Sequence, residues 1–451
     1  MEQTTYSVPE IYSVLQASPF TDTLTVTVPG SKSITNRALL LATLADGIST
    51  LNGVLFSDDS RHFLKCIQDL GFETAVDEEA AVITVKGCGG RVPLQNARQY
   101  VGSAGTAARF LTAYLGVSEG VYFMDASEQM RRRPMAPLLS SLKELGCEIL
   151  YPEDGKEGFF PFTLQGHSFG KKEITIDIAH SSQFLSALLI SSCLSKEDFT
   201  IHVQGTHGMA YIEMTCRMMA QFGVRTLREE GMADTGISYR TPAGQSYKAL
   251  SYFVEPDASA ACYFYACSPL LQIPVLVPGV HFHSLQGDVE FLHILEQMGC
   301  TALDTDEGIL VKPPLTLPYH GITVDMSACS DQAITLAAIA PFADSPTTIT
   351  GIGHIRFQEC DRLNAIATEL TRMGIRCDEG TDSLTIYPGV PRPCLVNTYD
   401  DHRMAMGLSL MGLRTPGIVI DNPGCCRKTF ENYFEVLDKT VATIQKGGNV
   451  V

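Results

Sequence analysis

The chain repeats one amphipathic helix pattern at a nearly constant interval. Five segments end in an apolar residue followed by a glycine, and these glycines are Gly71, Gly146, Gly223, Gly299 and Gly374. Each lies about 76 residues after the one before, which is longer than the common solenoid periods. A glycine directly after the last helical turn supplies the left-handed cap that ends a helix. Alternating apolar and polar residues follow most of these glycines and predict strands.

A second kind of helix is predicted between these copies. Six short segments are apolar, rich in small residues, and carry Ser, Thr or Asp near their start, residue types that favour helix N-caps. They are residues 32–45, 103–116, 181–192, 257–268, 330–343 and 400–413. A helix that is apolar all round is buried. The repeated unit therefore contains strands, one buried helix and one exposed helix, in about six copies.

Six copies in 451 residues predict two domains of three copies each, because a chain of this length exceeds one hydrophobic core. The best boundary is residues 253–256, since the residue before Pro256 is biased to extended geometry. The chain is expected to cross there and again near residues 28–30. The predicted fold is α/β, with an N-terminal domain of residues 30–254 and a C-terminal domain of residues 1–29 plus 255–451.

The composition excludes several function classes. A net charge of −17 argues against nucleic acid and anionic membrane as partners. No apolar run reaches the ~18 residues of a membrane span, and no signal-peptide pattern is visible. The 14 cysteines are scattered, which predicts free thiols in a reducing compartment. We therefore expect a cytoplasmic protein.

A metal is not expected. His281 and His283 could be two ligands on one strand face, but no Cys, Asp or His motif completes the set. We predict no metal and no cofactor.

Cations gather at the starts of two buried helices. Lys32, Ser33 and Arg37 open the first, and His402 with Arg403 opens the last, directly after Asp400 and Asp401. The first N–H groups of a helix lack internal partners and the dipole there is positive. Such a helix start suits phosphate or carboxylate. The sequence therefore predicts a site for small anions.

At these residues the chain resembles the EPSP synthase family of enolpyruvyl transferases. The matching motifs follow in order along almost the whole chain: GSKSITNRALLLATLA, GSAGTAARF, RRRPM, HSSQFLSALL, VEPDASAACYF, QGDVEFLHILEQMG, SDQAITLA, RFQECDRL, YDDHRMAM and CRKTF. The resemblance implies two domains of three βαβαββ repeats that close over substrate. It also implies transfer of the enolpyruvyl group of phosphoenolpyruvate to the 5-hydroxyl of shikimate 3-phosphate, with release of phosphate and without metal or covalent nucleophile.

The resemblance also implies roles for single residues. Those for the phosphoenolpyruvate phosphate are Lys32, Gly105, Arg133, Gln183 and Lys428, and those for its carboxylate are Arg362 and Arg403, a bidentate task that suits Arg. Shikimate 3-phosphate would be held by Ser33, Arg37, Ser181, Ser182, Tyr211, Asp331, His354 and Gln358. Asp331 would be the base for the 5-hydroxyl and Glu359 the acid for carbon 3, assisted by Lys32. The partners are these small molecules, and we expect a monomer.

Three positions depart from the family pattern. Gln358 replaces its Lys, Gly208 replaces its Ser, and His354 stands at its Asn, all on the shikimate 3-phosphate side. Three interpretations remain open. Neighbours such as His207, His354 or Arg356 compensate, the acceptor is a different alcohol, or the chain is a weakened or non-catalytic anion-binding paralogue.

Two further comparisons concern the loop residues. UDP-N-acetylglucosamine enolpyruvyl transferases open with G-A-K-N and carry a Cys on a mobile loop. This chain opens with GSKS instead, and its equivalent loop, residues 125–139, contains no Cys.

The resemblance implies that glyphosate competes with phosphoenolpyruvate near Gly105. Phe110, where sensitive relatives usually carry Pro, could loosen that inhibition.

Overall fold

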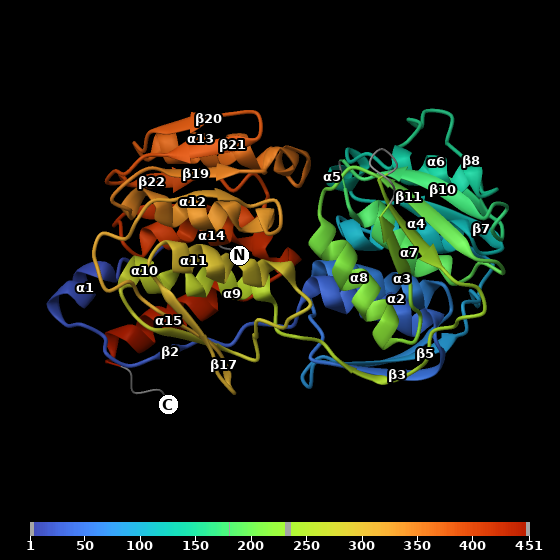
Figure 1. The fold of residues 1–451 in the computed structure, drawn as a ribbon, viewed down its shortest axis with the longest axis horizontal. Coiled ribbons are helices and arrows are strands. Elements are labelled where there is room, and N and C mark those ends of the chain that lie inside the picture. The colour runs from blue at the N-terminus through green and yellow to red at the C-terminus, as the bar shows by residue number, and fades with distance from the viewer. Residues whose placement is uncertain (1–3, 180, 231–235, 448–451) are drawn as a thin grey trace. The chain divides into compact units, whose positions relative to one another are not determined.

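The structure is a computed structural model and describes residues 4–179, 181–230 and 236–447. Two compact units make up the chain: Gly30–Val254, here the N-terminal unit, and Met1–Pro29 with Glu255–Val451, here the C-terminal unit (Figure 1). The segment before Gly30 adds β1 (Thr5–Ser7) and β2 (Leu24–Thr25) to sheets of the C-terminal unit.

The N-terminal unit contains three four-stranded sheets with one plan. Their strand orders are β14-β3-β5-β4, β6-β7-β9-β8 and β10-β11-β13-β12. In each, the first two strands are parallel and the others join antiparallel. The strands are β3 (Asp46–Asn52), β4 (Glu73–Asp77), β5 (Val82–Cys88), β6 (Asn96–Tyr100), β7 (Gly120–Asp125), β8 (Glu148–Leu150), β9 (Phe162–Gly166), β10 (Glu173–Asp177), β11 (Phe199–Gln204), β12 (Leu227–Glu230), β13 (Ile237–Thr241) and β14 (Ser251–Phe253).

The C-terminal unit repeats that plan. Its sheets have the orders β16-β17-β15-β2, β18-β19-β21-β20 and β1-β23-β22, and each again contains one parallel pair. The strands are β15 (Val275–Pro278), β16 (Thr301–Asp304), β17 (Gly308–Lys312), β18 (Thr323–Asp325), β19 (Thr347–Thr350), β20 (Cys377–Glu379), β21 (Ser383–Ile386), β22 (Cys394–Val396) and β23 (Ile418–Asp421). The predicted six-repeat α/β fold is confirmed.

The six predicted buried helices are present. They are α2 (Lys32–Leu44), α4 (Gly105–Gly116), α7 (Gln183–Ser192), α9 (Ala258–Tyr265), α12 (Ala333–Ile339) and α14 (His402–Gly412). Within their units α4 packs on α7 and α12 on α14. Every residue of α4 and of α14 is buried, which small and apolar side chains on all sides make favourable. Figure 1 shows α9, α11, α12 and α14 of the C-terminal unit close together, in agreement with the contacts of α9 with α11 and α14 and of α12 with α14.

The five amphipathic helices are also present. They are α3 (Asp58–Asp69), α6 (Ala136–Glu144), α8 (Met209–Gln221), α11 (Glu290–Gln297) and α13 (Arg362–Arg372). The glycine that follows each has a positive φ, between 84° and 106°, as the repeated glycine predicts.

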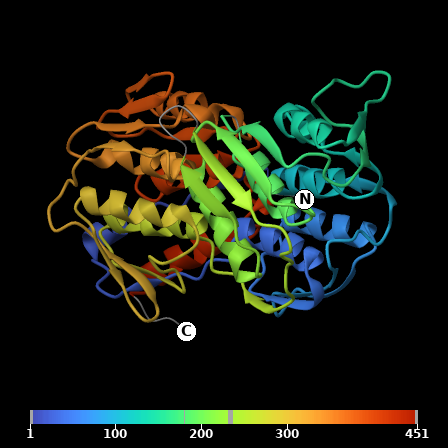
Figure 2. The same cartoon turned by 45° about the vertical axis from the view of Figure 1, so that its right-hand side comes forward.

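Figure 2 brings β10, β11 and β13 of the N-terminal unit forward, in green. The remaining helices are α1 (Tyr12–Ala17), α5 (Glu128–Arg131), α10 (Cys267–Leu271) and α15 (Tyr433–Gln445).

The expected N-caps are correct in part. Side chains of Ser31, Asp257 and Asp401 accept from backbone N–H groups at the starts of α2, α9 and α14. Helix α4 instead follows Ala104, and Asp331 lies in a short 3-10 turn, Ser330–Gln332, ahead of α12. Asp331 accepts instead from Arg362. No helix among the described residues has both the length and the hydropathy to cross a bilayer.

Candidate active site

In the N-terminal unit, polar groups converge on the first residue of α4. A Cβ added to Gly105 would lie 3.2 Å from Arg133 Nη1, 3.2 Å from Gln183 Oε1 and 3.3 Å from Arg109 Nη1. These three side chains come from α4, α7 and the loop after α5. Two guanidinium groups beside a helix N-terminus form a site suited to an anion. The structure thus brings together Gly105, Arg133 and Gln183, and it adds Arg109, to which the family resemblance gave no role.

Lys32 and Ser33 occupy the first turn of α2. Ser31 caps this helix, and the Lys32 ammonium lies 3.7 Å from the carboxylate of Asp59, which is buried. The Lys32 side chain is 18% exposed. Asn36, one turn further, donates to Thr106 Oγ1 at 2.6 Å and so ties α2 to the first turn of α4. The predicted anion sites of these two helices are therefore neighbours within this unit.

Arg37 is held inside the unit by several acceptors. Its Nε donates to Thr215 Oγ1 at 2.8 Å, and its terminal nitrogens donate to the backbone oxygens of Ser33 and Tyr211. Burial lowers the pKa of Arg37 to about 10, which leaves it charged at neutral pH. The guanidinium also lies over the Phe110 ring, 5.3 Å from its centroid. Phe110 therefore contacts Arg37, one of the residues predicted to bind shikimate 3-phosphate.

The start of α8 explains one departure from the family pattern. Gly208 has φ +65° at the N-cap of α8, and a Cβ there would lie 2.4 Å from Ser182 Oγ. In this conformation the position has no room for the family's Ser. Ser181 Oγ accepts from the backbone N–H of Gln183, and Tyr211 lies one turn into α8. The structure thus places Ser181, Ser182 and Tyr211 close to the same loop.

In the C-terminal unit, six charged side chains form one network, which we call the charge cluster: Asp331, Glu359, Arg362, Asp401, Arg403 and Lys428. Arg362 is 2% exposed, and its Nε and Nη2 donate to the two oxygens of Asp401 at 2.7 and 3.2 Å. It also donates to Asp331 Oδ1 at 3.0 Å and to Glu359 Oε2 at 2.7 Å. Three carboxylates therefore surround one buried guanidinium.

Two further cations complete the charge cluster. Arg403 Nη2 lies 2.8 Å from Asp331 Oδ2, and Lys428 Nζ donates to Glu359 Oε1 at 2.9 Å. Each predicted proton-transfer carboxylate thus bridges Arg362 and a second cation. Burial alone would lower the pKa of Arg362, but the charges of Asp401, Glu359 and Asp331 outweigh it and raise that pKa. The charge cluster thus pairs three carboxyl groups with three basic groups.

Sequence reasoning gave the Asp at the start of this helix only an N-cap role, whereas the structure places Asp401 at the centre of this network. Its side chain is fully buried and also accepts from the Arg403 backbone N–H at 2.9 Å. Tyr399 and Asp400, just before it, both have φ +55°, a strained conformation for residues other than glycine. Tyr399 donates to buried Glu369 at 2.8 Å, which anchors this turn. The sequence signal that could have identified Asp401 is the pair Asp400 and Asp401 directly before a segment predicted to be a buried helix.

His354 and Gln358 lie at the border of the charge cluster. His354 Nε2 is 2.7 Å from Ser330 Oγ, next to Asp331, and burial lowers the pKa of His354. Gln358 Oε1 accepts from Arg362 Nη1. Arg356 instead donates to Asp361, Glu379 and two backbone oxygens of the β20–β21 turn. Arg356 is therefore occupied by that turn.

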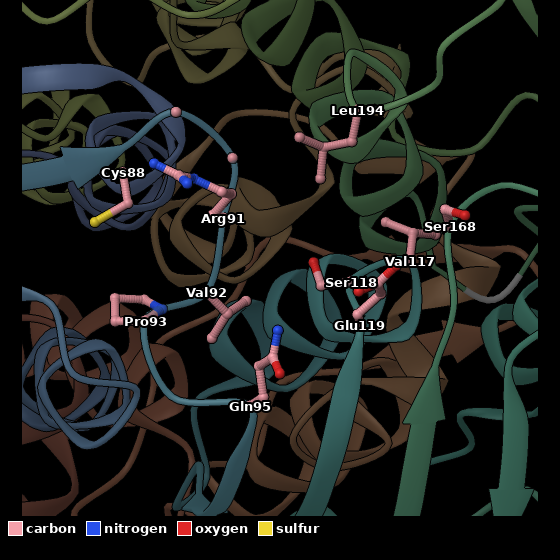
Figure 3. A pocket seen from close by; sticks show the side chains of 12 residues that line it. Cys88, Arg91, Val92, Pro93, Gln95, Val117, Ser118, Glu119, Ser168 and Leu194 are labelled. Carbon is pink, nitrogen blue, oxygen red and sulfur yellow. The ribbon is translucent and has the colours of Figure 1, made fainter.

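A pocket of about 590 Å³ in the N-terminal unit is lined by other residues than those described above. Figure 3 shows it between the loop after β5 and the carboxyl ends of α4 and α7, lined by Arg91, Val117, Glu119 and Leu194 among others. It contains none of the predicted site residues. Gly105 and Gln183 lie at the opposite, amino ends of the same two helices.

Comparisons with known proteins identify the family. A sequence model of the family described as EPSP synthase (3-phosphoshikimate 1-carboxyvinyltransferase) matches residues 22–437. A 3-phosphoshikimate 1-carboxyvinyltransferase from Trichormus variabilis is 44% identical over 411 residues, covering 91% of this chain and 94% of the relative. A 3-phosphoshikimate 1-carboxyvinyltransferase 2 from Halalkalibacterium halodurans is 39% identical over 418 residues, covering 92% and 91%.

Solved structures share the fold. The EPSP synthase of Acinetobacter baumannii superposes with a TM-score of 0.76 at 24% identity, over 94% of this chain and 97% of that one. The enolpyruvyl transferase NikO of Streptomyces tendae gives a TM-score of 0.68 at 16% identity, over 92% and 94%.

Proposed function

This chain belongs to the EPSP synthase family, and we propose that the polar clusters of its two units divide the groups of the two substrates between them. The enzyme, a 3-phosphoshikimate 1-carboxyvinyltransferase, transfers the enolpyruvyl group of phosphoenolpyruvate to the 5-hydroxyl of shikimate 3-phosphate. The products are 5-enolpyruvylshikimate 3-phosphate and phosphate. This is a step of aromatic amino acid biosynthesis.

Phosphoenolpyruvate is proposed to bind through the cations of both clusters. Arg362 and Arg403 take its carboxylate, because planar guanidinium groups match a carboxylate in bidentate fashion. Lys32, Arg133, Gln183 and Lys428 take its phosphate, with the Gly105 backbone. The convergence of Arg133 and Gln183 within 3.2 Å of the Gly105 Cβ direction supports this assignment.

Shikimate 3-phosphate is proposed to bind through Ser33 and Arg37 at its carboxylate and through Ser181 and Ser182 at its phosphate, with Tyr211 against its ring. Asp331, His354 and Gln358 complete this set from the C-terminal unit. The close approach of Ser182 and Tyr211 to Gly208 supports it, because it gathers these side chains at the start of α8. Of the groups that could compensate for Gln358, His354 is the better candidate, since Arg356 is held by Glu379 and Asp361.

The proton transfers are proposed to use the two bridging carboxylates. In its protonated form Glu359 gives its proton to carbon 3 and becomes a carboxylate, and Asp331 takes the proton of the 5-hydroxyl as the hydroxyl adds to carbon 2. The tetrahedral adduct then returns a proton from carbon 3 to Glu359 and releases phosphate. Before substrate binds, Lys428 and Arg403 neutralise these carboxylates at 2.9 and 2.8 Å. When substrate phosphate and carboxylate engage the same cations, each carboxylate loses part of its stabilisation as an anion and becomes a better proton carrier.

The charge cluster around buried Arg362 is the observation that carries this proposal. Phosphate release from phosphoenolpyruvate with shikimate 3-phosphate, measured in a coupled assay, tests it. Release with another alcohol alone would favour a different acceptor. Binding of phosphoenolpyruvate without release under any condition would favour an anion-binding paralogue.

Glyphosate should inhibit in competition with phosphoenolpyruvate. Its phosphonate would lie at the Gly105 backbone beside Arg133 and Gln183, where the added Cβ of Gly105→Ala would lie 3.2 Å from both. We expect this variant to weaken inhibition by more than tenfold, about 1.4 kcal/mol. Steady-state inhibition constants measure this. An unchanged inhibition constant in Gly105→Ala would remove Gly105 from the site.

Gln358→Lys should tighten shikimate 3-phosphate by up to about tenfold, because a cation makes a stronger, charge-assisted bond to phosphate. The affinity for phosphoenolpyruvate should change little. Isothermal titration with each substrate measures both. Weakened phosphoenolpyruvate binding with unchanged shikimate 3-phosphate would show instead that the main role of Gln358 is its hydrogen bond from Arg362.

The cellular setting is also a proposal. The described cysteines are free thiols, which suits a reducing compartment, and we infer a cytoplasmic enzyme. We further infer a monomer, which light scattering on the purified chain would test.

A further inference from the structure

A cluster of possible metal ligands lies in the C-terminal unit outside the charge cluster. His281 and His283 follow β15, and Asp304 ends β16. One ligand atom of each lies within 4.8 Å of the other two. The His281 Nδ1 to Asp304 Oδ1 distance is 2.7 Å, and the two imidazole rings are stacked with centroids 5.1 Å apart. Tertiary structure thus supplies the third ligand that the local sequence lacked.

The surrounding backbone holds the three side chains in place. The backbone N–H of Phe282 donates to Asp304 Oδ2 at 3.0 Å, which leaves Oδ1 directed at His281. The Phe282 ring stacks on His293 with centroids 5.1 Å apart. Asp304 is fixed by the pairing of β16 with β17, opposite Ile309. Hydrogen bonds to a ligand's other atoms are the support that metal sites require.

The donor set selects the kind of metal. Two imidazoles and one carboxylate are borderline donors that suit Zn²⁺ and similar transition ions, whereas Mg²⁺ and Ca²⁺ prefer oxygen ligands only. Tetrahedral Zn²⁺ with bonds of about 2.0–2.2 Å separates its ligand atoms by about 3.4 Å. The present separations, 2.7 Å for one pair and at most 4.8 Å for all, require shifts of about 1 Å, within the reach of half-exposed side chains.

We propose that His281, His283 and Asp304 bind one divalent transition-metal ion, of which Zn²⁺ is the best match, with solvent in the remaining position. The ion would join the segment after β15 to the end of β16. It takes no part in the proposed enolpyruvyl transfer, because none of its three ligands belongs to the charge cluster. Three ligands and an open position distinguish it from a closed structural zinc site.

The chain provides matched comparisons. His320 Nδ1 lies 2.6 Å from Asp344 in the same unit, and His202 Nε2 lies 3.4 Å from Glu173. Each pair offers one imidazole and one carboxylate. Among the described residues, only the set with two imidazoles brings three such ligands together. His320→Ala therefore removes a similar surface pair without touching the proposed site.

Zinc binding to the untagged full-length chain, stripped with EDTA and dialysed, tests the proposal by competition with a chromophoric chelator. We expect one Zn²⁺ per chain, binding more than tenfold weaker in His283→Ala and in Asp304→Asn, and unchanged in His320→Ala. Millimolar Mg²⁺ should not compete. Equal binding by the wild type and His283→Ala, or no saturable binding, would overturn the proposal. In the presence of EDTA, phosphate release should be the same for the wild type and the three variants. Failure of the zinc proposal would therefore leave the proposed function unaffected.

Discussion

Glu359→Gln is expected to lower turnover by about 10²–10⁴-fold, the usual contribution of a general acid. Gln keeps the shape of Glu and an oxygen that can accept from Lys428, which lies 2.9 Å from Glu359 Oε1. It cannot deliver a proton to carbon 3. Phosphoenolpyruvate binding should therefore weaken far less than turnover falls. Single-turnover phosphate release and equilibrium titration measure the two quantities separately.

The matched control for this variant is Glu379→Gln. Glu379 lies in the same unit and pairs with Arg356 at 2.6 Å, outside the charge cluster. The turnover of Glu379→Gln should stay within about twofold of the wild type, because surface ion pairs contribute little to the free energy of folding. Asp331→Asn should behave like Glu359→Gln, with loss of turnover. Near-normal turnover in Glu359→Gln would assign the proton donor elsewhere.

Arg362→Met is expected to destabilise the protein by about 3–5 kcal/mol and to abolish activity, because it leaves buried carboxylates without their shared cation. Asp401 is fully buried and receives two hydrogen bonds from Arg362. Asp331 and Glu359, which are 15% and 11% exposed, lose one each. Urea unfolding followed by circular dichroism measures the change in the free energy of unfolding.

Two comparisons make the Arg362 result specific. Arg356→Met removes an Arg that is 21% exposed and pairs with half-exposed carboxylates, and should cost only about 0–1 kcal/mol. Arg362→Met combined with Asp401→Asn should cost less than the sum of the single variants, because the amide removes the unpaired charge. Strict additivity would contradict the ion pair as the source of the effect.

Much of the fold could be predicted because it depends on local chemistry. The glycines after the five amphipathic helices take positive φ in the structure, since helix ends require it wherever they occur. The apolar composition of α4 and α14 predicted their burial. The N-cap predictions failed at α4, which follows Ala104, and at Asp331, which accepts from Arg362 instead.

The site could be predicted only in part. Family motifs indicated Lys32, Arg133, Glu359 and Arg362 as candidate site residues. No motif indicated that Asp401 would hold Arg362 or that Arg356 would turn toward Glu379. Both depend on which side chains face each other across helices and turns far apart in sequence. The same holds for Asp304, which lies 23 residues from His281 and completes its ligand set.

By itself, the sequence determined the repeat and the six buried helices, because hydrophobic periodicity and helix-end chemistry act over a few residues at a time. The family followed from motifs that resemble those of EPSP synthases. Tertiary structure decided which charges are neutralised and by what. Coulomb energies depend on distance and burial, and the 2.7 Å contact between Arg362 and Asp401, 39 residues apart, exists only once α13 and α14 are packed in the folded unit.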